Sequence, residues 1–202
     1  IVLYVKIVLR KKENKMKKAS IIILTLLVVL AFASCKNTEN KSEGFGNDLD
    51  IEYIEKDSLN FSLDLPFDWT ESSSSYLGTE VRHYNSKLDG PTDDIAESIS
   101  VTMEKPENYT SVDEYAKANI ENLKITFADF KIISDLQTEK IGDFEGLGAT
   151  FSYTMGVYKI VIEQSFVMTD DGMYIITCTA TDKSYDGFKD VFKSAKESFK
   201  VI

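Results

Sequence analysis

The sequence predicts an α+β protein, in which two amphipathic helices pack on an antiparallel sheet. Several segments alternate apolar and polar residues with a period of two, which is typical of half-buried strands. Short turn sequences such as Asp170–Asp171–Gly172 indicate hairpins, because glycine accepts a positive φ without strain. Two further segments place apolar residues at helical spacing. Since strands and helices do not alternate along the chain, a parallel sheet is not expected.

The first strand is expected in LNFSLDLP, residues 59–66, where apolar residues alternate with Asn, Ser and Asp. We expect the preceding DIEYIE to be its hairpin partner across Lys56–Ser58. After Pro66, the polar segment FDWTESSSS, residues 67–75, is expected to form a loop. Two short strands should follow at Glu80–Asn85 and Ser98–Glu104, separated by the turn-rich SKLDGPTDD.

The clearest helix is predicted in TSVDEYAKANIENLKITF, residues 110–127. One face of this helix collects Val112, Tyr115, Ala116, Asn119, Ile120, Leu123 and Phe127. Ser111 and Glu114 have the spacing of a capping box at its start. A β-rich tract should follow from about Phe130 to Thr181. A second amphipathic helix then closes the chain, with Phe188, Val191, Phe192, Ala195 and Phe199 at helical spacing.

Three sequence segments carry a family resemblance: FSLDLPFDW, SVDEYAKANIENL, and the stretch from GLGATFSYT to DGFKDVFKSAKESFK. In order and character they resemble the PsbP-like superfamily, which includes DcrB-type bacterial lipoproteins. The resemblance spans about Leu59 to Phe199. It implies an α/β/α sandwich with a central antiparallel sheet and helices packed on its faces. It implies no shared enzymatic activity, and likeness of fold alone does not define function.

Cys35 follows an apolar run that ends in small residues, in the sequence LLVVLAFASC. The apolar segment from Ile21 to Ala33 has 13 residues. A membrane-spanning helix needs roughly 20, whereas the apolar part of a secretion signal needs about 7–15. AFASC resembles the lipobox of bacterial lipoproteins, in which the signal is removed and the cysteine is lipidated. The alternative is a plain secretion signal followed by an incidental cysteine.

These features predict a division of the chain into four parts. Residues 1–15 are expected to be an upstream extension, because the first methionine is Met16, and residues 16–34 a lipoprotein signal peptide. Residues 35–50 are expected to form a flexible tether, and residues 51–202 a PsbP-like domain. The predicted location is the extracytoplasmic face of a cell membrane, periplasmic or at the cell surface, with the lipid on Cys35 holding the protein there.

The charge balance excludes nucleic acid as a partner. Residues 1–34 hold seven of the 23 Lys and Arg residues and one of the 33 Asp and Glu residues. The rest of the chain therefore carries 16 basic and 32 acidic side chains, a formal net charge of −16. Such a surface repels nucleic acid and anionic lipid headgroups.

The residue pattern offers no catalytic motif, and we expect neither an enzyme nor a bound cofactor. Cys178 alternates with apolar neighbours and is expected to be a small buried hydrophobe, not a nucleophile. His83 with the nearby acids Glu80, Asp89, Asp93 and Asp94 could suggest a metal site. A transition-metal site usually needs two or more His or Cys ligands. We therefore expect no metal, and interpret His83 as a solvated strand residue.

Binding surfaces concentrate on loops held by a rigid scaffold, so the two polar loops after the first strand are the candidate binding regions. The residues singled out there are Tyr76, His83, Tyr84, Asp93 and Asp94, although ordinary variable loops explain them equally well. Trp69 is expected to pack in the core, the alternative being a binding surface.

Two functions remain open, and a third, an unrecognised hydrolase, would need a cleft that contains carboxylates with a perturbed pKa. The first is a membrane-anchored lipoprotein with a non-catalytic domain that binds, or is accessory to, an envelope protein. The second is a small-molecule or cation-binding lipoprotein that serves a transporter. A sizeable, partly apolar pocket beside the sheet with convergent polar groups would favour the second function, and the absence of such a pocket would count against it.

Overall fold

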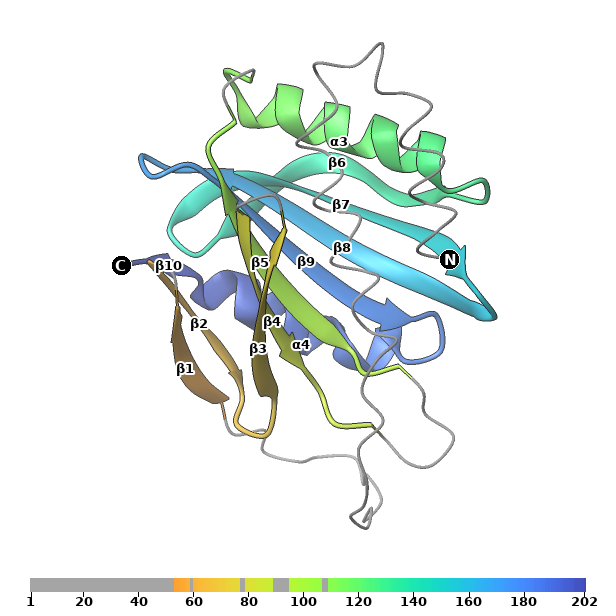
Figure 1. The fold of residues 1–202 in the computed structure, drawn as a ribbon, viewed down its shortest axis with the longest axis horizontal. Coiled ribbons are helices and arrows are strands. Elements are labelled where there is room, and N and C mark those ends of the chain that lie inside the picture. Colours follow the sequence, from red (N-terminus) through yellow and green to blue (C-terminus); the bar gives the residue numbers. More distant parts are fainter. Residues whose placement is uncertain (1–52, 59, 77–78, 89–94, 107–108) are drawn as a thin grey trace.

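A seven-stranded antiparallel sheet forms the centre of the computed structural model (Figure 1). The structure describes residues 53–58, 60–76, 79–88, 95–106 and 109–202. The strand order is β3-β4-β5-β9-β8-β7-β6. The strand bounds are Thr70–Tyr76 for β3, Thr79–Asn85 for β4, Ser98–Glu104 for β5, Lys131–Ile141 for β6, Phe144–Met155 for β7, Tyr158–Met168 for β8 and Met173–Thr181 for β9. Every pairing in this sheet is antiparallel, as the sequence predicts.

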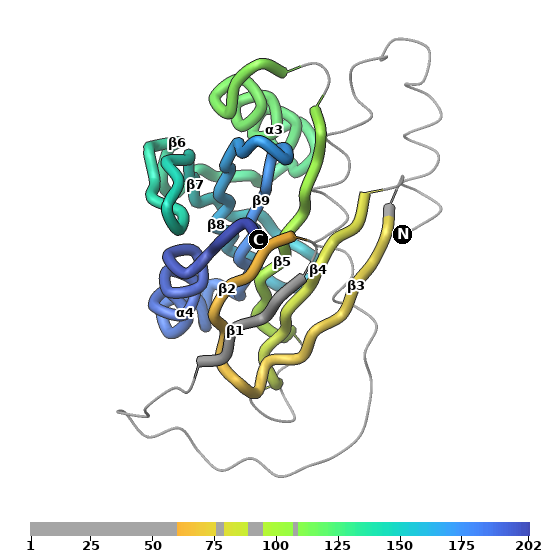
Figure 2. Tube along the Cα trace, turned by 90° about the vertical axis from the view of Figure 1, so that its left-hand side faces the viewer, coloured from red at the N-terminus to blue at the C-terminus, as the bar shows by residue number. Residues whose placement is uncertain are grey.

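A second, three-stranded sheet has the order β1-β2-β10. It joins the hairpin of β1 (Tyr53–Ser58) and β2 (Phe61–Pro66) to β10 (Lys200–Val201) at the end of the chain. The hairpin confirms the expected pairing in part: Tyr53–Glu55 of DIEYIE pair with β2, whereas Lys56–Ser58, expected as the turn, continue strand β1 and pair with Phe61–Leu63. Figure 2 shows strand β2 of this small sheet beside helix α4.

The two helices cover opposite faces of the seven-stranded sheet (Figure 1). Because side chains alternate along a strand, neighbouring residues of β9 belong to different cores. Met173 and Ile175 pack under α3 (Val112–Thr126), whereas Tyr174 and Ile176 pack toward α4 (Tyr185–Ser198) and β2. The predicted α/β/α sandwich is therefore confirmed, with the small sheet added on the α4 side.

The start of α3 follows the predicted capping pattern in part. The Ser111 side chain accepts a hydrogen bond from the Glu114 amide at 3.2 Å, which satisfies one of the free amides of the first turn. The Glu114 carboxylate reaches back to the amide and hydroxyl of Thr110, one residue earlier than a capping box requires.

The serine-rich segment after Trp69 differs from the prediction, because it forms strand β3 and not a loop. Thr70–Tyr76 pairs along its whole length with β4. The segment lies at the edge of the sheet and residues 70–75 are exposed, so it needs no alternating apolar face. Backbone pairing with β4 holds the strand in place, and its side-chain sequence gives no signal of this.

Two further expectations are confirmed. Trp69 is buried, at 6% exposure, and its ring lies 6.2 Å from the ring of Phe188 on α4. Cys178 is fully buried among the apolar residues on the α4 side. Both side chains therefore serve packing.

Candidate functional site

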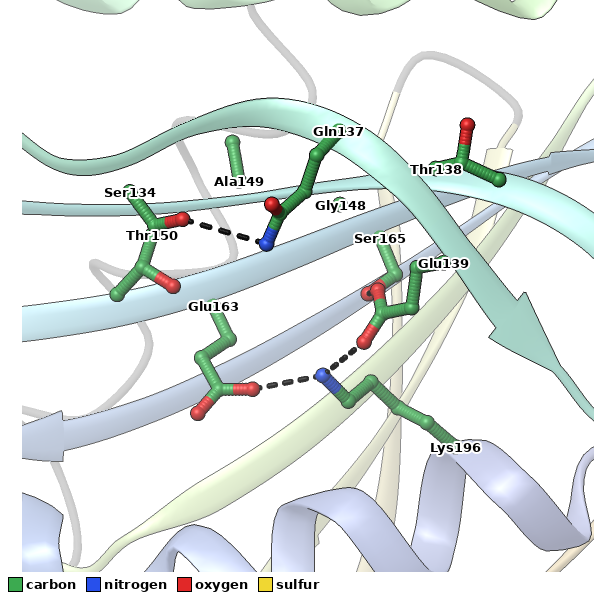
Figure 3. A pocket seen from close by; sticks show the side chains of 10 residues that line it. All are labelled: Ser134, Gln137, Thr138, Glu139, Gly148, Ala149, Thr150, Glu163, Ser165 and Lys196. Atoms are coloured by element: carbon green, nitrogen blue, oxygen red, sulfur yellow. Dashed lines mark hydrogen bonds and ion pairs between the residues drawn. The ribbon is translucent and has the colours of Figure 1, made fainter.

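A polar pocket lies on the α4 face of the sheet, where β6, β7 and β8 meet the end of α4 (Figure 3). Its volume is about 210 Å³. Ten residues line it: Ser134, Gln137, Thr138, Glu139, Gly148, Ala149, Thr150, Glu163, Ser165 and Lys196.

Lys196 is the centre of the charged part of this pocket. Its ammonium Nζ lies 2.5 Å from Glu139 Oε1 on β6 and 2.7 Å from Glu163 Oε2 on β8. The lysine is 7% exposed, so both contacts are screened far less than a surface ion pair. We call these three residues the Lys196 triad.

Two hydroxyl groups extend the triad. Ser165 donates to Glu139 Oε2 at 2.5 Å, and Tyr185 at the start of α4 donates to Glu163 Oε1 at 2.8 Å. Each carboxylate therefore accepts one bond from the ammonium and one from a hydroxyl. Hydrogen bonds to ionised groups are stronger than neutral ones, and they fix the orientation of both side chains.

Small residues on β7 leave room for these contacts. Gly148 pairs with Gln137 of β6 and Ser165 of β8, between the two strands that supply the glutamates. A Cβ atom at Gly148 would fall on the carboxylate of Glu139. The absence of a side chain at this position therefore allows Glu139 to lie over β7 and reach Lys196.

The charge state of Lys196 follows from its surroundings. Burial by itself lowers the pKa of the Lys196 ammonium, but the charges of Glu163 and Glu139 and the hydrogen bond to Glu139 act in the opposite direction, and the pKa lies above its ordinary value. Burial also raises the pKa of the Cys178 thiol, which is therefore neutral at pH 7. The two glutamates thus provide the counter-charge, and Lys196 is protonated. Burial and the neighbouring Glu163 also raise the pKa of Tyr185.

Sequence reasoning missed this site, although α4 contains a signal for it. Lys196 lies four residues after Phe192 and three before Phe199, on the apolar stripe of the helix. A lysine on a buried stripe is rarely left unpaired. Its glutamates lie 33 and 57 residues away in the chain, so the pattern of α4 does not identify them.

His83 lies on the opposite face of the sheet from this pocket. In the strand register, His83 of β4 pairs with Ser100 of β5. Ser100 pairs with Thr177 of β9, and Thr177 pairs with Gln164 of β8. Gln164 bonds to Asn119 of α3, so this row of residues faces α3. The adjacent Glu163 faces the other way.

The structure corrects the expectation that His83 is solvated. Its side chain is buried, and its Nε2 lies 2.8 Å from Ser74 Oγ across the β3–β4 hairpin. Its Nδ1 has no hydrogen-bond partner among the described residues, so no third group orients the ring as in a serine–histidine triad. Burial lowers the pKa of His83.

Of the other residues expected on binding loops, the structure describes Tyr84 and the backbone of Tyr76. Tyr84 lies in β4 and is fully buried in the core beside Ile99, which corrects its assignment to a binding loop. Tyr76 is the last residue of β3. Asp93, Asp94 and the expected lipid-attachment residue Cys35 lie outside the described residues.

Within the described part of the chain, no group of three or more His, Cys, Asp or Glu side chains could hold a metal ion. Neither α3 nor α4, the helices in that part, has the length and apolar character needed to cross a membrane.

Comparison with solved structures identifies a PsbP-like fold. Cyanobacterial PsbP (CyanoP) from Synechocystis superposes with a TM-score of 0.55 at 11% identity, over 80% of this chain and 98% of CyanoP. LpqN of Mycobacterium tuberculosis, a protein involved in cell envelope biogenesis, gives 0.53 at 15% identity, over 76% and 92%. PA94 of Pseudomonas aeruginosa, whose function is unknown, gives 0.52 at 14% identity, over 72% and 94%.

No family model matches the sequence, and no curated protein matches it. At these identities the structural likeness defines the fold alone.

Proposed function

We propose that this protein is a lipid-anchored, extracytoplasmic binding domain that acts on a partner in the cell envelope and not as an enzyme. The single observation that carries the proposal is the position of Cys35, which follows the 13-residue apolar segment Ile21–Ala33 with only Ser34 between them. A diacyl or triacyl anchor on this cysteine provides the two or more chains that stable membrane attachment needs.

The described geometry supports binding more than covalent chemistry. Lys196 is held protonated by two carboxylates, and the thiol of Cys178 is neutral and fully buried. A nucleophile needs the deprotonated amine or the thiolate, so neither group is activated for attack. LpqN, which shares the fold, is involved in cell envelope biogenesis. A role of the present protein in the cell envelope would agree with the proposed extracytoplasmic location.

Attachment of lipid to Cys35 is the first test. The full chain would be expressed in a bacterium that matures lipoproteins and is fed an alkyne-bearing palmitate analogue. We expect the label on the wild-type protein, a mass that corresponds to loss of residues 1–34, and no label on a Cys35→Ser variant. Cys178→Ser is the matched control and should label like the wild type. Equal labelling of Cys35→Ser would contradict the proposal.

A partner would then be sought by crosslinking in native membranes. We expect the anchored wild-type protein to capture a membrane protein that Cys35→Ser does not. Identical capture by both variants would show that the anchor does not serve partner binding, and substrate turnover by the purified domain would refute the non-enzymatic role.

The second candidate function is the binding of a small ligand for delivery to a transporter. The pocket beside Lys196 supports it in part: charged and neutral polar side chains from four elements converge there, but the pocket is small and its lining is mostly polar. Its volume is below the range of about 300–1,000 Å³ that is typical for drug-sized ligands. A ligand of this site would therefore be small and polar.

A further inference from the structure

We propose that the pocket beside Lys196 binds a small ligand through an ammonium group of that ligand. This inference rests on the second candidate function and adds the chemical class of the ligand. It depends on the charge of the Lys196 triad, on its unused hydrogen-bond acceptors and on the shape of the pocket.

The first argument is charge. The triad contains two carboxylates and one ammonium, which gives a formal net charge of −1. The side chains of Glu139 and Glu163 are 26% and 14% exposed, so this charge is only partly hydrated. Electrostatic interactions are stronger in such surroundings than in water. A ligand with one positive charge makes the site neutral, whereas an anion would increase the imbalance.

The second argument is hydrogen bonding. An ionised carboxylate has about four acceptor positions. Glu139 uses one for Lys196 and one for Ser165, and Glu163 uses one for Lys196 and one for Tyr185. Each glutamate therefore keeps about two acceptor positions, which the N–H donors of an ammonium group would fill. Lys196 gives two of its three donors to the glutamates, which leaves one for a ligand oxygen.

The third argument is shape. The neutral part of the pocket comes from β6 and β7, with Ser134, Gln137 and Thr150 among its lining residues (Figure 3). Gln137 is exposed, so it lies where a ligand would enter. A cavity of about 210 Å³ has room for on the order of seven water molecules, or for a ligand with a similar number of non-hydrogen atoms. A short hydroxylated amine fits both this size and the lining.

A metal ion fits the same residues less well. Hard cations need six or more oxygen ligands, or octahedral geometry with retained waters. Here the ammonium of Lys196 already lies between the two carboxylates and would repel a metal ion that bridged them. An organic ammonium group donates hydrogen bonds and can bind each carboxylate from its open side.

The test is calorimetric titration of the full chain, purified in detergent at constant ionic strength, with ethanolamine hydrochloride. Ethylene glycol is the neutral analogue, and calcium chloride and potassium chloride are the metal controls. We expect saturable binding of ethanolamine, with at least tenfold weaker binding of ethylene glycol. Glycerophosphoethanolamine, the soluble headgroup of an amine-bearing lipid, tests whether the ammonium group comes from a lipid or from a free amine. If it binds more tightly than ethanolamine, the site is specific for lipid headgroups. If it binds more weakly, the site is specific for free amines.

Two pairs of variants locate the binding. Glu163→Gln should weaken it at least tenfold, while Glu197→Gln, at an exposed position on α4, should leave it unchanged. Glu163→Gln could unfold the protein, so a second pair uses the exposed Gln137. Gln137→Lys places an ammonium at the entrance and should compete with the ligand, reducing affinity at least tenfold. Gln137→Met, of similar length and without charge, should bind within twofold of the wild type.

Each other outcome overturns the inference. It is wrong if no amine binds to the folded protein, if ethylene glycol binds as well as ethanolamine, or if Gln137→Lys binds like Gln137→Met. Binding of ethylene glycol or calcium in place of the amine would leave the second candidate function standing. Absence of all ligand binding would remove that function as well.

Discussion

On the α4 face of the sheet, Glu139 and Glu163 share the ammonium of Lys196, whereas on the α3 face Glu104 has the phenol of Tyr115 as a neutral partner. Tyr115 donates to Glu104 Oε2 at 2.7 Å, and Glu104 Oε1 is buried without a partner among the described residues. Burial raises the pKa of Glu104, although the hydrogen bond from Tyr115 acts in the opposite direction.

The residues around Glu104 and around the Lys196 triad also differ in charge. On the α3 face, Asn119 donates to Gln164 at 2.6 Å and Gln164 donates to Thr177 at 3.1 Å, so these three buried residues form an uncharged network. The α4 face holds charged groups beside a pocket. A neutral buried network fixes how a helix packs, whereas a charged group beside a cavity can also receive a ligand. The comparison therefore indicates a packing role for the α3 face and agrees with the proposed binding role of the α4 face.

The largest effect is expected from Lys196→Met, which leaves two carboxylates facing each other without a cation. Removal of one partner of a buried ion pair costs roughly 3–5 kcal/mol, and we expect about 3 kcal/mol because Glu139 and Glu163 are partly exposed. Urea unfolding at pH 7 measures it. Lys193→Met, whose side chain is 70% exposed, should cost less than about 0.5 kcal/mol. A loss below about 1 kcal/mol for Lys196→Met would contradict the description of the triad.

Gly148→Ala should disturb the same face without removing a charge. The new Cβ would meet the carboxylate of Glu139 and displace it from Lys196. Overpacking of this kind typically costs about 1–3 kcal/mol. Gly187 lies at an exposed position on α4, and a Cβ atom added there would meet no atom within 4 Å. Gly187→Ala should therefore stabilise the protein by roughly 0.5–1 kcal/mol, because alanine favours the helix more than glycine does. Equal stability changes for the two variants would show that Glu139 can move at little cost.

Tyr115→Phe tests the α3 face, where the hydroxyl is the described donor to Glu104. Leaving a buried acceptor unsatisfied costs about 1–3 kcal/mol. We expect a loss near the lower end, because Glu104 can bind a proton instead, and a smaller loss at pH 5 than at pH 8. Thermal and urea unfolding at both pH values measure this. If the loss is the same at pH 5 and pH 8, Glu104 does not change its protonation state.

The pH dependence of Glu104 should be the smallest effect. Because the folded-state pKa lies above its ordinary value of 4.5, the folded protein binds more protons at this site than the unfolded chain. This contribution to stability is fully present below pH 4.5 and is lost as the pH rises through the folded-state pKa. As the pH rises above 4.5, the free energy of unfolding should therefore fall less for Glu104→Gln than for the wild type.

Unfolding of Glu104→Gln would be followed from pH 4 to 8, with Glu121→Gln, an exposed position on α3, as the control. Parallel curves for the wild type and Glu104→Gln would contradict a raised pKa at Glu104.

Local patterns predicted most of the fold. The alternation in β2 identifies the core residues Phe61, Leu63 and Leu65, and the helical spacing of α3 and α4 identifies their buried faces; both patterns are visible in a short window of sequence. Strand β3 was not predictable in this way. Its exposed serines carry no periodicity, and the partner that holds it, β4, begins three residues later.

The candidate site was much less predictable than the fold. The sequence pointed to polar loops and to His83, whereas the structure brings together Glu139, Glu163 and Lys196 from three separate elements. This juxtaposition depends on the register of β6, β7 and β8, which alternation alone does not fix. Lys196 on an apolar stripe was the one local sign that a buried charge needed partners.

The central claim is that the Lys196 triad serves binding more than stability, and the free energy of unfolding of a neutral replacement tests it most directly. The variant Glu139→Gln/Glu163→Gln/Lys196→Met removes all three charges while the glutamines can still accept from Ser165 and Tyr185. Replacement of a whole buried ion cluster by neutral residues is often neutral or stabilising. We predict stability within about 1 kcal/mol of the wild type in urea unfolding at pH 7. A loss of about 3 kcal/mol or more would show that the triad is a structural element.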